Sequence, residues 1–281
     1  MQVFKTIQEV RSWARQRQNA SKSIGFVPTM GALHEGHLSL VRCAKQNNDG
    51  CIASIFVNPT QFNNAEDLKN YPRTLENDLR KLESAGCDAV FAPDAEQMYS
   101  RKPRLQINFG VLEEVMEGAF RPGHFNGVAL VVSKLFHIVS PARAYFGEKD
   151  FQQLAVIRCM TKDLSFDTEI VGVPTVREED GLAMSSRNLR LTPVERGIAP
   201  AVYQSLQACR DHFLKFGQAK EAVAHARALL KRHPEITFEY LELVDAETLQ
   251  PVAEPDDAAH VQACIAVHLG QVRLIDNISV K

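Results

Sequence analysis

Two histidines, His34 and His37, follow a short glycine-containing turn and could together meet an anionic group. The run Ser23–Val27 before the turn is apolar and partly β-branched, which predicts a buried strand. Apolar residues in the stretch 38–44 after the turn have the spacing of a helix. If that helix begins near His34, both imidazoles lie one turn apart on one face at its N-terminus. Free N–H groups and the helix dipole favour an anion there, so the segment predicts a phosphate site.

Three interpretations of the two histidines compete. They could be ordinary packing or surface residues, since histidine is often intermediate in burial. They could bind zinc, but a metalloprotease helix carries His-Glu-x-x-His, and here only two residues separate the histidines. No further cluster has the spacing of zinc ligands, so we expect no protein ligands to a metal. Nucleotide phosphate is the third interpretation.

The composition of the 281 residues narrows the class of protein. With 32 basic and 34 acidic residues the net charge is −2, and there is no basic block, which argues against nucleic acid as a partner. No apolar run has the length of a membrane span, and the first residues lack the apolar region of a signal peptide. Six scattered cysteines without a C-x-x-C pair are typical of reduced thiols, so we expect a cytoplasmic location.

Short apolar runs alternate with helical patterns over the first two thirds of the chain. A capping box formed by Thr6 and Glu9 predicts the start of the first helix. Strands are predicted at 23–27, 51–57, 89–92, 144–147 and 169–176, and helices at 74–85, 126–139 and 150–160. Such alternation predicts an α/β fold with a Rossmann-like parallel sheet that helices cover on both faces.

The pattern changes after Arg190. Thr192, Pro193 and Glu195 form a second capping box with proline at the first helical position. Helices are predicted at 193–215 and 218–232, and strands at 237–244, 262–268 and 272–275. We therefore expect residues 1–177 to form the Rossmann-like domain, and residues 178–281 to form a smaller α+β domain with an antiparallel sheet.

Polar motifs follow four of the predicted strands. They are Pro28–His37, Asn58–Phe62, Gly147–Asp150 with Gln152 and Gln153 behind it, and Met184–Asn188. Taken singly, they could be a plain turn, a charged surface cluster or a solvated loop. The carboxyl ends of parallel strands meet at one edge of a sheet, and open α/β sheets bind ligands at that edge. The four motifs together therefore predict a ligand site there.

Two of these motifs resemble the signatures of a nucleotide-binding superfamily. The string HEGH at 34–37 is similar to the histidine signature of nucleotidylyltransferases and class I aminoacyl-tRNA synthetases, and MSSRN at 184–188 resembles their KMSKS-like signature. With PTMGALHEGHLSL, FVNPTQF, YPRTLENDL, FRPGHFNGV and YFGEKDFQQL added, the chain resembles the pantothenate synthetase family, also called pantoate–β-alanine ligases, over essentially its whole length. The last third carries fewer of the signature residues.

The resemblance implies an ATP-dependent ligase of pantothenate and coenzyme A biosynthesis. Pantoate and ATP give pantoyl adenylate and pyrophosphate, and β-alanine then displaces AMP to give pantothenate. The resemblance further implies Mg²⁺ bound through the phosphates, a homodimer, and a C-terminal domain that forms a lid over the site. Neither nucleic acid nor a membrane is expected as a partner.

The resemblance also implies roles for individual residues of this sequence. It implies catalytic roles for His34, His37, Lys149 and Arg187, and substrate contacts for Asn58, Gln61 and Gln153. It implies that ATP is bound by Met30, Gly31, Ala32, Leu33, His34, Glu35, Gly36, His37, Gly147, Glu148, Lys149, Asp150, Val176, Met184, Ser185, Ser186 and Arg187. Where synthetases carry Lys-Ser-Lys, this chain has Ser-Ser-Arg, so Arg187 is expected to take over part of the cationic role.

The chemistry of the implied reaction agrees with these residue types. A pantoate carboxylate is already a nucleophile at neutral pH, so the main cost is negative charge that builds on the α-phosphate and the leaving pyrophosphate. Preorganised cations and hydrogen-bond donors aimed at those oxygens are the expected source of catalysis. Arginine can fork onto two phosphate oxygens, whereas lysine acts as a point charge.

Three residues outside the four strand-end motifs carry weaker expectations. Asp78 lies on the predicted helix 74–85, where it could support the site from behind its ligand contacts, although a solvated carboxylate is the simpler interpretation. Asn126 precedes an apolar helical run, and we expect it to cap that helix. The role of Arg121 stays open.

Three other functions also stay open at this point. A plain adenylyltransferase stops at a stable nucleotide product, a metal-dependent hydrolase uses His34, Glu35 and His37, and a nucleotide sensor binds ATP without turnover. Release of AMP that depends on β-alanine excludes the first. Stoichiometric zinc in the purified protein favours the second, and release of pyrophosphate with pantoate excludes the third.

Overall fold

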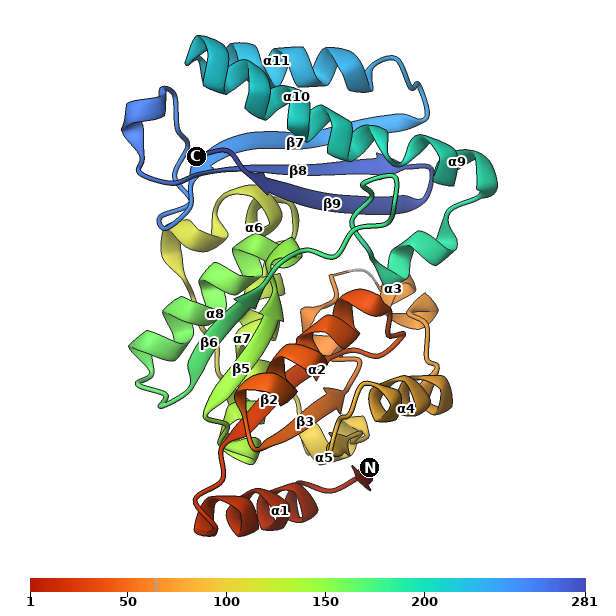
Figure 1. Cartoon of the computed structure of the whole chain (residues 1–281), viewed down its shortest axis with the longest axis vertical. Helices are drawn as coiled ribbons and strands as arrows, with labels where there is room; N and C mark the ends of the chain where they lie inside the picture. The colour runs from red at the N-terminus through yellow and green to blue at the C-terminus, as the bar shows by residue number, and fades with distance from the viewer. Residues whose placement is uncertain (64) are drawn as a thin grey trace. The chain divides into compact units, whose positions relative to one another are not determined.

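The structure, a computed structural model, describes residues 1–63 and 65–281 (Figure 1). Its chain divides into two compact units. Unit 1 comprises Met1–Glu113, Phe120–Glu148 and Gln153–Pro174, and unit 2 comprises Glu114–Ala119, Lys149–Gln152 and Thr175–Lys281. Unit 2 thus includes two short segments that the sequence places among the strands and helices of the first two thirds.

Unit 1 is built on a six-stranded sheet. Its strands are β1 (Gln2–Phe4), β2 (Ile24–Thr29), β3 (Gly50–Ile55), β4 (Ala89–Phe91), β5 (Arg143–Gly147) and β6 (Glu169–Val173). They lie in the order β1-β4-β3-β2-β5-β6, and each neighbouring pair is parallel, which confirms the predicted Rossmann-like α/β fold. β6 ends before Pro174, which has no N–H for the ladder, so Val176 lies beyond the sheet and not in the predicted strand.

Helices follow the strands through the first two thirds of the chain. They are α1 (Ile7–Asn19), α2 (Glu35–Asn47), α3 (Ala65–Asn70), α4 (Leu75–Ser84), α5 (Ala95–Met98), α6 (Met116–Phe120), α7 (His124–Val139) and α8 (Phe151–Asp163). The capping box formed by Thr6 and Glu9 opens α1 as predicted. The sequence did not predict α3, α5 and α6, because 4–6 residues are too few to show a helical period.

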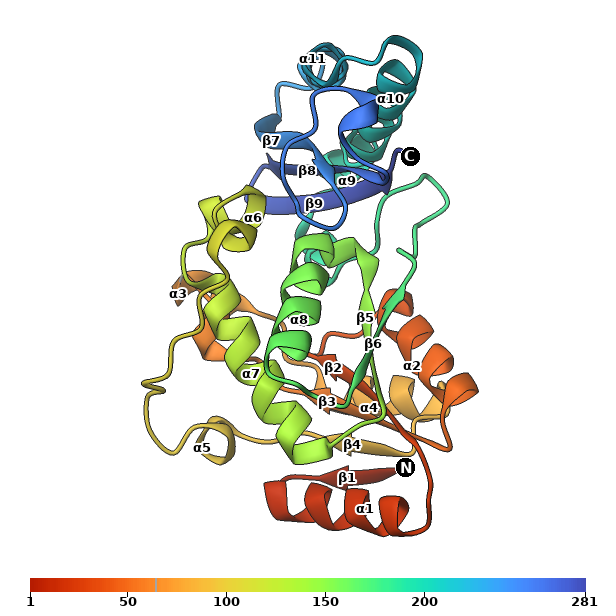
Figure 2. The same ribbon diagram turned by 90° about the vertical axis from the view of Figure 1, so that its left-hand side faces the viewer.

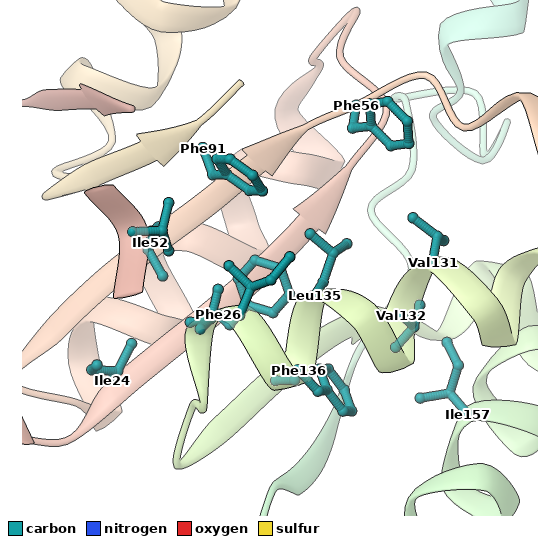
Figure 3. Packing of buried hydrophobic residues seen from close by; sticks show 14 of the residues in the cluster. Ile24, Phe26, Ile52, Phe56, Phe91, Val131, Val132, Leu135, Phe136 and Ile157 are labelled. Atoms are coloured by element: carbon teal, nitrogen blue, oxygen red, sulfur yellow. The ribbon is translucent and has the colours of Figure 1, made fainter. Parts of the chain in front are cut away.

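Side chains that alternate along each strand enter two separate cores. Phe26 packs in a cluster with residues of α1, α7 and α8, whereas its neighbour Val27 packs in another cluster with residues of α2 and α4. Figure 2 shows α7 and α8 on one side of the sheet and α2 on the other. In Figure 3, Phe26 of β2 lies beside Phe136 of α7, with their rings 6.4 Å apart, and Phe91 of β4 belongs to the same cluster. Both faces of the sheet are therefore covered.

The order of the strands reverses around β2. From β2 the chain passes to β3 and then β4 on one side, whereas β5 and then β6 lie on the other side. Open α/β sheets bind ligands at the carboxyl ends of strands beside such a switch point. The loops that follow β2, β3 and β5 all begin at this edge of the sheet (Figure 1), so the fold selects the same edge as the sequence motifs.

The prediction that Asn126 caps a helix is wrong. Helix α7 begins two residues earlier, at His124, and its N-cap is Gly123, whose φ of 79° suits glycine. Asn126 therefore lies inside the first turn. Its Oδ1 accepts a hydrogen bond of 2.9 Å from the backbone N–H of Ile107, so it fixes the extended segment that precedes α6.

Unit 2 contains a three-stranded sheet packed against helices. Strands β7 (Ile236–Asp245), β8 (Val261–Leu269) and β9 (Val272–Ser279) pair in the order β7-β8-β9, and both pairings are antiparallel, as predicted. Buried residues of the sheet share one cluster with residues of α10 (Ala201–Phe216) and α11 (Ala219–Leu230). β9 continues four residues beyond the predicted end at Ile275 and so carries Asp276 and Asn277 into the sheet.

The single helix predicted at 193–215 is wrong. The capping box of Thr192 and Glu195 opens α9 as predicted, but α9 (Pro193–Ile198) ends after two turns and α10 starts at Ala201. Pro200 stands between them, and its missing N–H cannot continue the helical ladder. Within the described residues, none of the helices combines the length and the apolar character that crossing a membrane requires.

Candidate functional site

The turn between β2 and α2 is held by a buried carboxylate. Gly31 and Ala32 both have positive φ values, of 84° and 50°, which turn the backbone sharply. Asp78 of α4 accepts hydrogen bonds from the backbone N–H groups of Ala32 (2.9 Å) and Leu33 (2.8 Å). Asp78 is only 1% exposed, so the interpretation as a solvated carboxylate is wrong. A Cβ on Gly31 would lie 3.1 Å from Asp78 Oδ2, which explains the small residue.

His34 and His37 meet at the start of α2, as the spacing predicts. His34 is the N-cap of α2, and the two ring centroids are 4.1 Å apart. The backbone N–H of His34 donates to Nδ1 of His37 over 3.3 Å. Because a backbone N–H can only donate, Nδ1 of neutral His37 must accept and Nε2 must carry the proton. His37 thus has a donor on the far side of its ring, which is the form that an anionic oxygen needs.

Glu35 lies between the histidines but its carboxylate has another partner. It pairs with Arg42 two turns along α2, and both side chains are about half exposed. The hydrogen bond from Arg42 lowers the pKa of the Glu35 carboxyl, so it is ionised at neutral pH. A carboxylate on a solvated surface pair is a poor partner for phosphate, and Glu35 can offer a nucleotide only its backbone.

The loop after β3 orients the Gln61 amide through Asn58. Asn58 is 1% exposed, and its Oδ1 accepts from the Thr60 N–H (3.3 Å). Its Nδ2 donates to the carbonyl of Gly127 (3.1 Å) and to Oε1 of Gln61 (2.9 Å). The N–H only donates and the carbonyl only accepts, so the amide of Asn58 has one orientation and fixes that of Gln61. The NH₂ group of Gln61 therefore points away from Asn58 and lies 3.3 Å from Sδ of Met30, which is only a weak acceptor.

Three further residues of unit 1 hold this loop in place. The Tyr99 hydroxyl donates to Oδ1 of Asn58 over 2.9 Å, and burial raises the pKa of Tyr99, which keeps that hydroxyl protonated. Nδ1 of His124 is 2.8 Å from the carbonyl of Gln61 and must donate to it. A Cβ on Gly127 would lie 2.2 Å from the carbonyl oxygen of Thr60, so only glycine lets α7 approach this closely.

The motif after β5 is divided between the two units. Gly147 ends β5 and belongs with Glu148 to unit 1, whereas Lys149 and Asp150 belong to unit 2. Gln153, which is half-buried in the first turn of α8, belongs to unit 1.

Gln152 in the same motif has an internal role. It is 4% exposed, accepts from the backbone N–H of Glu117 (2.9 Å) and donates to the carbonyl of Val115 (2.9 Å). Both partners lie in the 114–119 segment of unit 2, so Gln152 links the two short segments of that unit.

The second signature lies at the end of a short hairpin in unit 2. The Met184 N–H donates to the carbonyl of Val176 over 3.0 Å, which joins the two arms. Ser185 then caps a 3₁₀ turn by accepting from the N–H of Arg187 over 3.2 Å. Ser186 is buried and Arg187 is half-buried. This short turn thus places two hydroxyls and one guanidinium within three consecutive residues.

A cavity of about 430 Å³ lies elsewhere in unit 1. Its lining includes Lys22, Ser140 and Asp167, which precede β2, β5 and β6 at the amino end of the sheet, and His137 near the end of α7. None of the predicted site residues lines this cavity. Volume alone therefore does not identify the site. Among the described residues, no three His, Cys, Asp or Glu side chains gather as a metal cage would require.

Several functional contacts could not be read from the sequence. The sequence motifs include Asn58 and Gln61, and unit 1 brings these two residues together with Met30. Asp78, Tyr99 and His124 were not assigned to the site, although each binds a residue of it. The available signals were the strings YPRTLENDL, which contains Asp78, and FRPGHFNGV, which contains His124; both are among the motifs of the resemblance.

Comparisons with known proteins agree over the whole chain. A family model described as Pantoate-beta-alanine ligase matches residues 2–279. A pantothenate synthetase of Phocaeicola vulgatus is 50% identical, with 100% of both chains covered, and one of Cytophaga hutchinsonii is 47% identical, with 97% of both covered.

Solved structures give the same result. The crystal structure of pantothenate synthetase from Thermus thermophilus matches with a TM-score of 0.93 at 47% identity and covers 100% of this chain and 99% of that one. A pantoate-beta-alanine ligase from Francisella tularensis, complexed with beta-gamma ATP and beta-alanine, matches with a TM-score of 0.83 at 36% identity and covers 100% of this chain and 98% of that one.

Proposed function

This chain belongs to the pantoate-beta-alanine ligase family, and from that membership we propose how its residues perform the reaction. The chain is a ligase that condenses (R)-pantoate with β-alanine and converts ATP to AMP and pyrophosphate, through a pantoyl adenylate. The strongest support for the site is that the switch point beside β2 gathers His34, His37 and Gln61 where an open sheet binds ligands.

The first step forms the adenylate. A carboxylate oxygen of pantoate attacks the α-phosphorus of ATP, the bond from that phosphorus to the bridging oxygen breaks, and pyrophosphate leaves with the electron pair. Negative charge builds on the non-bridging oxygens and on the leaving group. The proton on Nε2 of His37 is directed away from its Nδ1 contact, so we assign it to a phosphate oxygen, with His34 beside it.

Cationic groups of unit 2 supply the rest of the charge in this proposal. We assign Lys149 and Arg187 to the phosphates, with Ser185 and Ser186 as hydroxyl donors. We assign apolar and backbone contacts with the nucleotide to Val176 and Met184, and backbone contacts to Asp150 and to Gly147 and Glu148 of unit 1. From unit 1, residues Met30–Gly36 line the nucleotide. The N–H groups of Ala32 and Leu33 are engaged by Asp78, so these two residues contribute shape and not donors.

The second step forms the amide. The amine of β-alanine attacks the acyl carbon, the bond from that carbon to the AMP oxygen breaks, and the amine loses a proton. We assign Gln61 and Gln153 to pantoate, with the Gln61 NH₂ donating to an anionic or carbonyl oxygen. Asn58 is buried beneath Gln61, so we assign it the role of orienting that amide. Holding two reactants in line is worth roughly 7–11 kcal/mol at best.

We propose that Mg²⁺ accompanies ATP and is held mainly by the phosphates. Magnesium keeps several waters and needs few protein ligands. The oxygens of Asp78 are engaged by backbone N–H groups, which makes this buried carboxylate a poor ligand. When bound, the ion neutralises part of the phosphate charge.

Three further proposals concern the whole protein. We propose that residues 178–281 form a lid over a nucleotide and pantoate site on residues 1–177, that the protein is a homodimer, and that it is cytoplasmic. Six free cysteines support the last point. Sedimentation should give twice 31.4 kDa. Bound ATP and pantoate should slow amide hydrogen exchange in the 184–188 turn.

The proposed function has a direct test. The protein is incubated with ATP, Mg²⁺ and pantoate, with and without β-alanine, and pyrophosphate, AMP and pantothenate are measured. We expect stoichiometric pyrophosphate without β-alanine, and continuous release of AMP and pantothenate with it. Continuous turnover to a stable nucleotide product without β-alanine would instead identify a plain adenylyltransferase.

A further inference from the structure

Two guanidinium groups hold the hairpin that leads into the second signature. Arg196 of α9 pairs with Glu178 and Asp180 of the hairpin, and Arg177 ties the hairpin to β9. Arg177 follows Val176, and its backbone forms a bridge with Ala183, next to Met184. Its side chain extends to β9, where Nη1 and Nη2 donate to the two carboxylate oxygens of Asp276 over 2.7 and 2.9 Å. Residues 177 and 276 are 99 positions apart, so this fork is a long-range contact within unit 2.

The surroundings of Arg177 leave it little freedom. Its Nη1 also donates to the carbonyl of Gly181 (3.0 Å), at the tip of the hairpin, and Nη2 donates to the carbonyl of Asn277 (3.0 Å). The guanidinium lies 3.8 Å from the ring centre of Tyr203 on α10. The Arg177 side chain is 20% exposed and that of Asp276 only 4%. A planar group with this many partners holds both arms of the hairpin in one position.

The residue next to Asp276 holds the other cationic segment of unit 2. Nδ2 of Asn277 donates to the carbonyl of Lys149 over 2.8 Å. Its Oδ1 accepts from Nε2 of Gln262 on β8 over 2.6 Å, which orients the amide so that Nδ2 faces Lys149. Asn277 is 6% exposed, so water does not compete easily for these bonds.

We propose that Asp276 and Asn277 are positioning residues for the ATP contacts of unit 2. Asp276 fixes the 176–184 hairpin, and with it Ser185–Arg187, through Arg177. Asn277 fixes the backbone of Lys149. Neighbouring residues of one strand direct their side chains to opposite faces, so two consecutive positions of β9 can support two separate cationic segments. The end of β9 thereby sets the positions of both the Ser185–Arg187 turn and the Lys149 backbone.

This inference rests on the proposed function, because it assumes that Lys149 and Arg187 contact the phosphates. It predicts a specific kinetic pattern. If positioning of the cations is lost, ATP binding and adenylate formation suffer, whereas capture of the adenylate by β-alanine does not. A merely structural role would weaken every step alike.

The test compares Asp276→Asn, Asn277→Leu and Arg177→Lys with the wild-type protein. Asp276→Asn removes the charge and one acceptor at nearly constant shape, Asn277→Leu removes the donor to Lys149, and Arg177→Lys removes the fork. For each variant, KM for ATP and pantoate-dependent release of pyrophosphate are measured, together with KM for β-alanine at saturating ATP and pantoate. We expect KM for ATP to rise roughly tenfold and adenylate formation to slow by a similar factor, as expected for lost charge-assisted contacts. KM for β-alanine should stay within about twofold.

Glu117→Gln is the matched control. Glu117 is also a buried carboxylate in unit 2 that pairs with an arginine of β9. Nη1 and Nη2 of Arg273 donate to its Oε2 and Oε1 over 2.8 and 2.7 Å. The Tyr240 hydroxyl of β7 also donates to the Glu117 carboxylate, and the backbone N–H of Glu117 that bonds Gln152 is kept in this variant. We expect this variant to lower the melting temperature without a selective rise in KM for ATP.

Three results would overturn the inference. The first is that the three variants fold and keep KM for ATP and adenylate formation within twofold of wild type, while Lys149→Ala and Arg187→Ala lose both. The second is that Glu117→Gln shows the same selective defect. The third is that Lys149→Ala and Arg187→Ala themselves keep normal adenylate formation, which would contradict the proposed function and this inference with it.

Discussion

The predicted ATP and substrate contacts of the two units are held in place by different means. In unit 1, the Met30–His37 and Asn58–Gln61 segments leave adjacent parallel strands at the same edge of the sheet. Buried partners such as Asp78 then fix the local turns. In unit 2, Lys149 and the Ser185–Arg187 turn are held by side chains of one antiparallel strand.

This difference shows that site residues can be positioned either by the topology of a sheet or by individual side-chain contacts. A parallel sheet brings its loops together whatever their sequence, so a substitution in unit 1 should act at the changed residue or on the loop that this residue touches. In unit 2 the fork between Arg177 and Asp276 ties a whole hairpin to β9. A substitution there should act at a distance, on residues it does not touch.

The largest effect is expected in unit 1 at His37. His37→Ala removes the donor that we assign to phosphate, and we expect turnover to fall by roughly 10²–10³ with little change in melting temperature. The matched control is His137→Ala, since His137 is an exposed histidine on α7. Near-normal turnover of His37→Ala would show that topology places the histidines at this edge without giving them the proposed role.

A smaller effect is expected at Gln61. Gln61→Glu keeps an acceptor for Asn58 but replaces the outward NH₂ with a charged oxygen. Lost hydrogen bonds to a charged group cost roughly 1.5–3 kcal/mol, so kcat/KM for pantoate should fall about 10- to 100-fold. Gln61→Met, which removes the donor without adding charge, should lose less. Equal kcat/KM for pantoate in all three proteins would contradict the orientation assigned to this amide.

Gly127→Ala tests how tightly α7 holds the Gln61 loop. The new methyl group would lie 2.2 Å from the carbonyl oxygen of Thr60, so the helix or the loop must move. We expect the free energy of unfolding to fall by about 1–3 kcal/mol in urea denaturation, with a rise in KM for pantoate. Gly197→Ala in α9 is the control, because a Cβ there meets nothing within 4 Å. Equal stability of both variants would disprove the close packing.

The smallest effect is expected at Glu35. Its carboxylate pairs with Arg42 on a solvated face of α2, and such surface pairs are worth about 0–1 kcal/mol. Glu35→Gln should therefore change the free energy of unfolding by less than about 1 kcal/mol and leave KM for ATP within about twofold. A large rise in KM for ATP would mean that the Glu35 side chain, and not only its backbone, contributes to the nucleotide site.

Local patterns were sufficient to predict most of the fold and the edge that carries the site. The apolar run before Pro28, the helical spacing after His37 and the capping box at Thr6 are properties of neighbouring residues. The strand and both helices appear in the structure, although β2 continues through Pro28 to Thr29 and not only to the predicted end at Val27. Alternating elements then imply a parallel sheet whose strand ends carry the motifs.

Contacts between distant residues could not be predicted in the same way. Asp78 lies on a helix with exposed neighbours, so its position in the sequence does not predict burial. Its role becomes evident only from its hydrogen bonds with the backbone N–H groups of Ala32 and Leu33. Asp276 and Arg177 are 99 residues apart, and no local pattern relates them. Asn126 matched a capping residue in type, but the glycine three positions earlier had the backbone freedom to open the helix.

The most direct test of the account follows the oxygen atoms of pantoate. The central claim is that ATP activates the carboxylate as an adenylate before β-alanine attacks. If pantoate is labelled with ¹⁸O in both carboxylate oxygens, one labelled oxygen should appear in AMP and the other in the amide carbonyl of pantothenate. Unlabelled AMP, or label recovered in pyrophosphate or inorganic phosphate, would contradict that claim.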